Sequence, residues 1–171
     1  MKKDNRMTVE KDSTEQAHKL TLDMFGTSEE VREMAIMEQQ ATSLEEVKAV
    51  LKKLVGKSLQ SRSGIVATIS NKTIKKITSG KATGKSFDAK AHFLAAANLE
   101  KLFANAIEPF KFSLSPKKNN ENYRDVRRLY APMSYRGRII PVKFTVMEMF
   151  YEKDGKRIYS LEAIDADLDK K

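Results

Sequence analysis

The chain lacks cysteine altogether and holds only two histidines among its 171 residues. Without cysteine, neither a disulfide framework nor a thiolate metal site can form, which agrees with a reducing cytoplasmic setting. Long apolar runs are also missing, and none approaches the roughly 20 residues that a membrane helix needs. The N-terminus MKKDNRMTVEKD is followed by no apolar segment of the secretory type. We therefore expect a cytoplasmic protein of one ordinary domain, with an appended arm.

Acidic residues are scarce in the middle of the chain. Residues 48–145 carry 21 Lys/Arg and 5 Asp/Glu, a net charge of +16, whereas residues 1–47 carry −5 and residues 146–171 carry −2. Protein surfaces that only face solvent usually mix positive and negative side chains. The predominantly positive segment 48–145 therefore favours a polyanionic ligand. Nucleic acid is the favoured ligand, with anionic membrane or acidic protein as alternatives. We predict an acidic helical N-terminal arm at 1–55 and a basic α+β domain at 56–171.

The stretch SGKATGKS at 79–86 resembles a phosphate-binding P-loop but fails the pattern. Only three residues separate Gly80 from Gly84, where the P-loop requires four, and the preceding NKTIKKITS is polar instead of a buried strand. A nucleotide-binding fold is therefore rejected. The lysines of this loop precede a predicted helix, whose N-terminus attracts anions, so we expect them to hold phosphate by charge.

Hydrophobic periodicity and turn residues predict the order of elements. Ser or Thr followed three residues later by Glu, as at Thr27 and Ser43, is a capping-box pattern that begins a helix. Alternating residues and turn signals predict three C-terminal strands joined by short turns. We expect α+β architecture, in which N-terminal helices and a further helix pack on a roughly four-stranded antiparallel sheet. The expected helices are 14–25, 43–56 and 88–107, and the expected strands are 64–70, 126–133, 139–151 and 157–164.

Two groups of residues could carry chemistry. His92 lies in the apolar stripe of the 88–107 helix, so it is either an acid–base group at the sheet edge or a histidine bonded to backbone. Arginine beside tyrosine on the predicted sheet suits phosphate clamping and base stacking, although an ordinary solvated face gives the same pattern. The acidic run DADLD at 165–169 is read as a solvated tail instead of a metal site.

Several segments together resemble a known family. They are GIVATIS, NKTIKKITS, AHFLAAANLEKLFANAIE, RRLYAPM, IIPVKFTVMEMF and IYSLEAID. Over about residues 56–165 the chain is similar to the large polyvalent protein-associated domains of phages and conjugative elements. These are close in pattern to the phage barnase/EndoU/colicin/RelE-like (BECR) nucleases. The resemblance implies a metal-independent RNA-cleaving fold in a bacterial host cell, with no cofactor and no membrane partner.

In that chemistry a 2′-hydroxyl attacks its own phosphate, which needs a proton acceptor, a cation and a proton donor. The resemblance implies that His92 is the acid–base group and that Lys143 or Arg128 stabilises charge. Thr145, Tyr130 or Tyr159 would orient the phosphate or donate a proton. The alternative is a non-catalytic nucleic-acid-binding or host-interaction protein, with RNA favoured over DNA and residues 14–55 serving a protein partner or self-association. The expected nucleic-acid-binding residues are Lys72, Lys75, Lys76, Lys81, Lys85, Arg127, Arg136 and Arg138.

Overall fold

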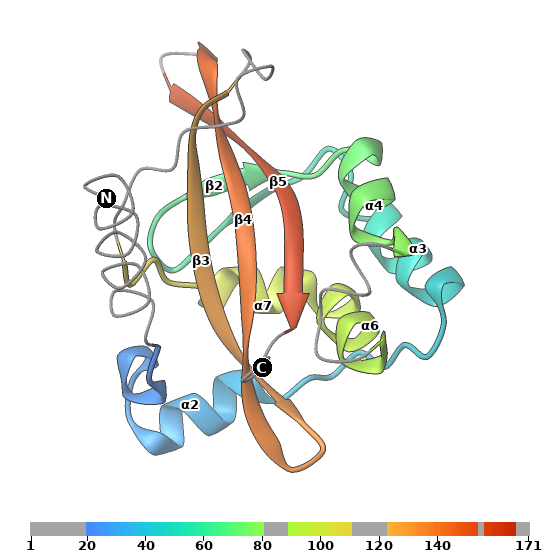
Figure 1. The fold of residues 1–171 in the computed structure, drawn as a ribbon, viewed down its shortest axis with the longest axis vertical. Helices are drawn as coiled ribbons and strands as arrows, with labels where there is room; N and C mark the ends of the chain where they lie inside the picture. Colours follow the sequence, from blue (N-terminus) through green and yellow to red (C-terminus); the bar gives the residue numbers. More distant parts are fainter. Residues whose placement is uncertain (1–19, 81–88, 111–122, 154–155, 167–171) are drawn as a thin grey trace, which may run out of the picture.

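The computed structural model describes residues 20–80, 89–110, 123–153 and 156–166 (Figure 1). It confirms the α+β class, with one sheet and helices packed beside and behind it. Within the described residues, no helix combines the length and the apolar character required to cross a bilayer. Half of the helix expected at 14–25 lies outside the described residues, and the described half contains only a 3₁₀ turn, η1 (Leu22–Phe25).

The sheet has five strands in the order β1-β2-β5-β4-β3. The long strands β3, β4 and β5 form the predicted antiparallel meander, but β2 pairs with β5 in parallel. The expectation of about four antiparallel strands is therefore corrected in both number and direction. Strand β1 was missed because three residues carry too little alternation to be recognised. The bounds are β1 Ser58–Gln60, β2 Val66–Thr68, β3 Tyr123–Tyr135, β4 Arg138–Lys153 and β5 Lys156–Ala166.

A sharp turn joins β3 to β4 at the predicted place. Arg136 and Gly137 both have positive φ, of 52° and 76°, and Tyr135 pairs with Arg138 across the two-residue loop. Two consecutive residues with positive φ match the twist of a hairpin, and glycine reaches this region without steric cost. The turn fixes the register of β3 against β4 from Tyr135 back to Asp125, where the register shifts, and this register decides which side chains become neighbours.

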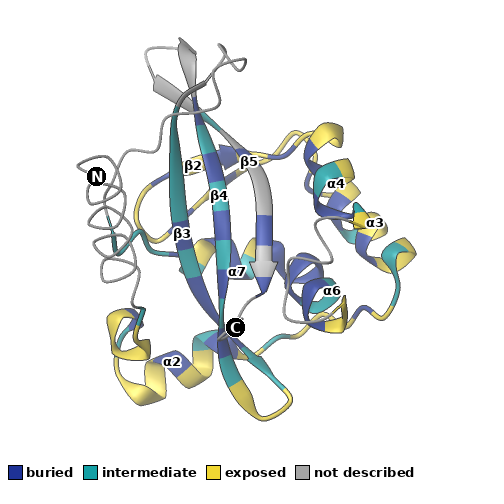
Figure 2. Ribbon diagram, viewed as in Figure 1, coloured by how far each residue is buried: buried dark blue, intermediate teal, exposed yellow. Residues whose placement is uncertain are grey.

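The helices bury one stripe each against the inner face of the sheet or against one another. Phe103 of α7 meets Phe144 of β4 edge-on, with ring centroids 5.4 Å apart. Figure 2 shows that burial is concentrated on the central strands and on the inward sides of α6 and α7. The helices are α2 Ser28–Ala35, α3 Leu44–Lys52, α4 Asn71–Ile77, α6 Ala89–Ala97 and α7 Leu99–Asn105.

Both predicted N-caps are present. In α2, Glu30 N–H donates to the Thr27 hydroxyl and Thr27 N–H donates to the Glu30 carboxylate, a complete capping box. In α3 the Ser43 hydroxyl accepts from Glu46 N–H, but the Glu46 carboxylate bonds to Thr42 and to the Ser43 hydroxyl instead of closing the box.

Helix α3 belongs to the same core as the sheet. Val47 and Leu51 are fully buried within it, although the charge pattern assigned them to the arm at 1–55. The division of the chain at residue 55 remains a prediction.

The helix expected at 88–107 is divided at Asn98 into α6 and α7. The buried Asn98 side chain donates to the backbone carbonyls of Gln39 and Leu94, at 2.8 Å each, and accepts from Gln39 N–H at 3.0 Å. It therefore satisfies backbone groups of the connector between α2 and α3. The predicted stripe is confirmed, since His92, Ala96, Leu99, Phe103 and Ala106 are all fully buried.

Candidate nucleic-acid interface

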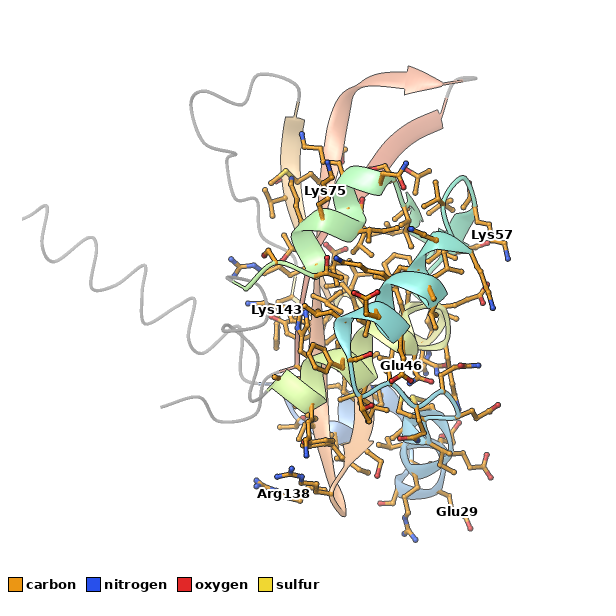
Figure 3. The ribbon with its side chains drawn as sticks, turned by 90° about the vertical axis from the view of Figure 1, so that its right-hand side faces the viewer. Glu29, Glu46, Lys57, Lys75, Arg138 and Lys143 are labelled. Atoms are coloured by element: carbon orange, nitrogen blue, oxygen red, sulfur yellow. The ribbon has the colours of Figure 1, made fainter. Side chains whose placement is uncertain are left out.

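Alternation along β4 divides its side chains between two faces. Val142, Phe144 and Val146 are buried beneath the helices, so Lys143 and Thr145 point to the opposite side. Likewise Leu129 and Ala131 of β3 face inward, and Arg128 and Tyr130 face outward. We call the set Arg128, Tyr130, Lys143 and Thr145 the outer face. Figure 3 shows Lys143 on the side of the sheet away from α3 and α4.

Register brings these four residues together. Arg128 lies directly opposite Thr145, and Tyr130 lies directly opposite Lys143. Side chains in such positions have Cβ atoms about 4.5–5.5 Å apart, and the diagonal neighbours are within reach of long side chains. All four residues are half-buried. Four of the six predicted catalytic residues therefore form one compact group.

The outer face combines two cations with an aromatic ring. The Tyr130 ring meets Phe110 nearly edge-on, with centroids 6.3 Å apart, so two aromatic side chains lie beside the cations. Burial raises the pKa of the Tyr130 phenol, and the Arg128 charge only partly opposes this. The phenol is therefore protonated at neutral pH and can donate a hydrogen bond. This surface can hold phosphate and stack a base.

Arg127 lies on the inner face, where carboxylates hold it. Its Nε and one terminal nitrogen donate to the two Glu108 oxygens at 2.6 Å each, and its other terminal nitrogen lies 3.7 Å from Glu148. The Glu108 side chain is 6% exposed and the Glu148 side chain 2%. Hydrogen bonding to Glu108 raises the pKa of Arg127 above its ordinary value, so the guanidinium stays charged. The structure places Arg127 in an ion-pair cluster and not among the outer-face residues.

Tyr159, another predicted catalytic residue, joins the same cluster. Its hydroxyl lies 3.4 Å from a Glu148 oxygen, to which it donates, and 3.5 Å from an Arg127 nitrogen. The Arg127 guanidinium also lies over the Tyr159 ring, 5.9 Å from its centroid. Tyr159 is thus separated from Tyr130 and Lys143 by the sheet itself.

His92 is fully buried between α6 and α4. Its Nε2 lies 2.7 Å from the Ile77 carbonyl at the end of α4. Because a carbonyl oxygen only accepts, Nε2 carries the proton and donates it there. The structure therefore gives His92 the backbone-bonded arrangement, the alternative weighed for it from sequence. It does not bring His92 together with Arg128 and Lys143.

The predicted phosphate-binding cations are spread over several elements. Lys72 and Lys75 are exposed on α4 and Lys76 is half-buried there, whereas Arg136 and Arg138 lie at the β3–β4 hairpin. Figure 3 shows Lys75 and Arg138 toward opposite ends of the molecule. Lys81 and Lys85 lie outside the described residues. Arg136 sits over the Tyr135 ring, 5.1 Å from its centroid.

Sequence reasoning overlooked two lysines of α3. Lys48 and Lys52 lie four residues apart on the exposed side of that helix, and with Lys75 they line a hollow between α3 and α4. Their spacing was the available signal, because residues four apart share one helix face. No group of three or more His, Asp or Glu side chains in the described ranges is arranged to hold a metal ion.

Comparisons with known proteins identify a family. Neither the curated proteins nor the solved structures provide a match to this chain. A family model does match: the one described as large polyvalent protein-associated domain 3, over residues 38–159. The match begins before α3 and ends in β5, so it includes the outer face and most of the described core. Because it covers well over half of the chain, the protein belongs to the large polyvalent protein-associated domain 3 family.

Proposed function

We propose that this domain binds single-stranded RNA on the outer face of its sheet. The observation that supports the proposal most is the cross-strand pairing of Arg128 with Thr145 and of Tyr130 with Lys143. The guanidinium and the ammonium contact neighbouring phosphates, and the phenol ring offers a stacking surface for an unpaired base. Single-stranded RNA is favoured because its bases are free to stack, whereas those of a duplex are already stacked on one another.

Charge supports the same ligand. Residues 48–145 carry a net charge of +16, which attracts phosphate chains from a distance and makes the affinity depend on salt. The inner-face cluster contributes little to this attraction, because Arg127 is matched by Glu108 and Glu148. In this proposal the cations of the outer face provide the local contacts with RNA.

Fluorescence anisotropy with a labelled 12-nucleotide RNA tests the proposal. The double variant Arg128→Gln/Lys143→Gln is expected to reduce the salt slope of binding by about 1.4, since each phosphate contact on a single strand contributes about 0.7. Tyr130→Leu should weaken binding through lost stacking, at about 1–3 kcal/mol for one base. The control Lys57→Gln/Lys90→Gln removes the same charge from exposed positions elsewhere. Equal affinities of the outer-face variant and wild type would refute the proposal.

Metal-independent RNA cleavage is the second candidate, and the same four residues favour it. The attacking 2′-hydroxyl would lose its proton to solvent, and Arg128 and Lys143 would stabilise the charge that develops on the phosphorane oxygens. The Tyr130 phenol, which is protonated at neutral pH, would donate a proton to the leaving 5′-oxygen. Wild type and Tyr130→Phe incubated with total RNA in EDTA separate the candidates. Cleavage by wild type that is lost in Tyr130→Phe supports an enzyme. Salt-sensitive binding with intact RNA in both samples supports the binding module.

A further inference from the structure

A second basic surface lies on the helical side of the molecule. The hollow between α3 and α4 has a volume of about 670 Å³. Lys48 and Lys52 line it from α3, and Lys75 lines it from α4, with Asn71 and Thr78 beside them. Figures 1 and 3 show the two helices side by side, with the sheet beyond them. We call this hollow the lysine groove.

The helix packing explains why the lysines converge. Val47 and Leu51 of α3 are fully buried, and Ile77 of α4 is fully buried as well. These apolar stripes face the core. The opposite side of the two helices faces solvent and carries the exposed residues Lys48, Lys52 and Lys75. The two short helices meet along their length, so their exposed lysines face a common space.

Charge in this region is of one sign. Residues 47–80 contain eight Lys/Arg and no Asp/Glu. The acids nearest in sequence are Glu46 and Glu45, and Glu45, three residues before Lys48, lies on the same side of α3. It offsets part of one lysine charge, and the groove keeps a clear positive excess.

We propose that the lysine groove is a second nucleic-acid site, which binds the phosphate backbone of a duplex without reading its sequence. Ammonium groups act as point charges on phosphate and lack the planar fork with which arginine reads a base edge. None of the described residues that line the groove is aromatic, so they offer no platform for an unpaired base. Its chemistry thus differs from that of the outer face.

The shape of the groove argues against a membrane or an acidic protein as its ligand. A bilayer surface is broad, and membrane-bound helices insert exposed apolar side chains beside their lysines. Among the described residues that line the groove, Ile74 is the one that is apolar, and it is 6% exposed. Protein interfaces place aromatic and apolar anchors at their centre, and this described lining provides neither an aromatic nor an exposed apolar side chain. A strand of closely spaced phosphates matches a concave row of lysines best.

A mixed-sequence 20-base-pair RNA duplex is the probe. The triple variant Lys48→Gln/Lys52→Gln/Lys75→Gln is expected to lower the salt slope of duplex binding by about 2.7, using a contribution of about 0.9 for each duplex phosphate. The control Arg32→Gln/Lys57→Gln/Lys90→Gln removes the same charge from three exposed positions outside the groove. It should change the slope by less than about one, through distant charge alone. Thermal unfolding checks that every variant is folded.

The Glu45→Gln variant tests the lysine groove independently of the triple variant. Removing this carboxylate is expected to tighten duplex binding about twofold in low salt. Equal losses in the groove triple and its control would overturn the proposal, because they would mean diffuse attraction. Groove-dependent binding to phosphatidylserine vesicles or to polyglutamate, without duplex binding, would overturn it too. The groove is independent of the outer face, so duplex binding without single-strand binding would refute only the function proposed above.

Discussion

Replacing His92 by alanine should destabilise the protein and leave RNA binding by the folded fraction unchanged. The imidazole is fully buried and donates at 2.7 Å to the Ile77 carbonyl. Its removal leaves a buried carbonyl without that donor, at about 1–3 kcal/mol, and opens a cavity whose cost adds to this. We expect a total loss near ~3 kcal/mol, which lowers the melting temperature of a chain of this size by about 6–12 °C.

Differential scanning calorimetry and RNA anisotropy on the same samples provide the assay. His92→Gln is the matched variant, because its amide can still donate to the Ile77 carbonyl and fills more of the space. It should lose about half as much stability as the alanine variant. The reasoning would be refuted if His92→Ala melted like wild type and yet lost RNA binding or cleavage, since that result requires a functional imidazole.

Three further predictions concern the polar contacts of the fold. Arg127→Met leaves Glu108 and Glu148 buried without this cation and should cost about 3–5 kcal/mol by urea unfolding. Hydrogen bonds from Thr27 hold the pKa of Glu30 below its ordinary 4.5, so this stabilisation is present above that pH and lost as pH falls. As the pH is lowered below 4.5, the melting temperature of Glu30→Gln should therefore fall less steeply than that of wild type. Asn98→Ala should cost about 2–3 kcal/mol and speed hydrogen exchange in the connector between α2 and α3.

The local pattern predicted much of the fold because the elements follow their own periodicity. The alternation of apolar and polar residues around Phe144 correctly predicted the two faces of β4. The apolar stripe from His92 to Ala106 correctly predicted the buried side of α6 and α7. The parallel pairing of β2 with β5 depends on contacts between residues about 90 positions apart. No local pattern specifies such a pairing. The division at Asn98 was hidden because the helical pattern continues through it.

The site was only partly predictable for a related reason. Arg127 and Arg128 are adjacent in a strand, so they must point to opposite faces, and a pattern of two arginines does not say which faces inward. Glu108, in the segment that follows α7, pairs with Arg127, and Arg128 lies on the outer face. The stripe predicted the direction of His92 but not its depth, because α3 and β5 pack on α6 and the end of α4 places the Ile77 carbonyl against the imidazole.

The order β1-β2-β5-β4-β3 also has a consequence for synthesis on the ribosome. Strand β5 is the last of the five to be translated, yet it lies in the middle of the sheet. Until residues 156–166 leave the exit tunnel, the edges of β2 and β4 stay unpaired and the core beneath them stays open. Folding of this domain must therefore wait for its final strand, and a nascent chain halted before that point offers two exposed edges to chaperones or to aggregation.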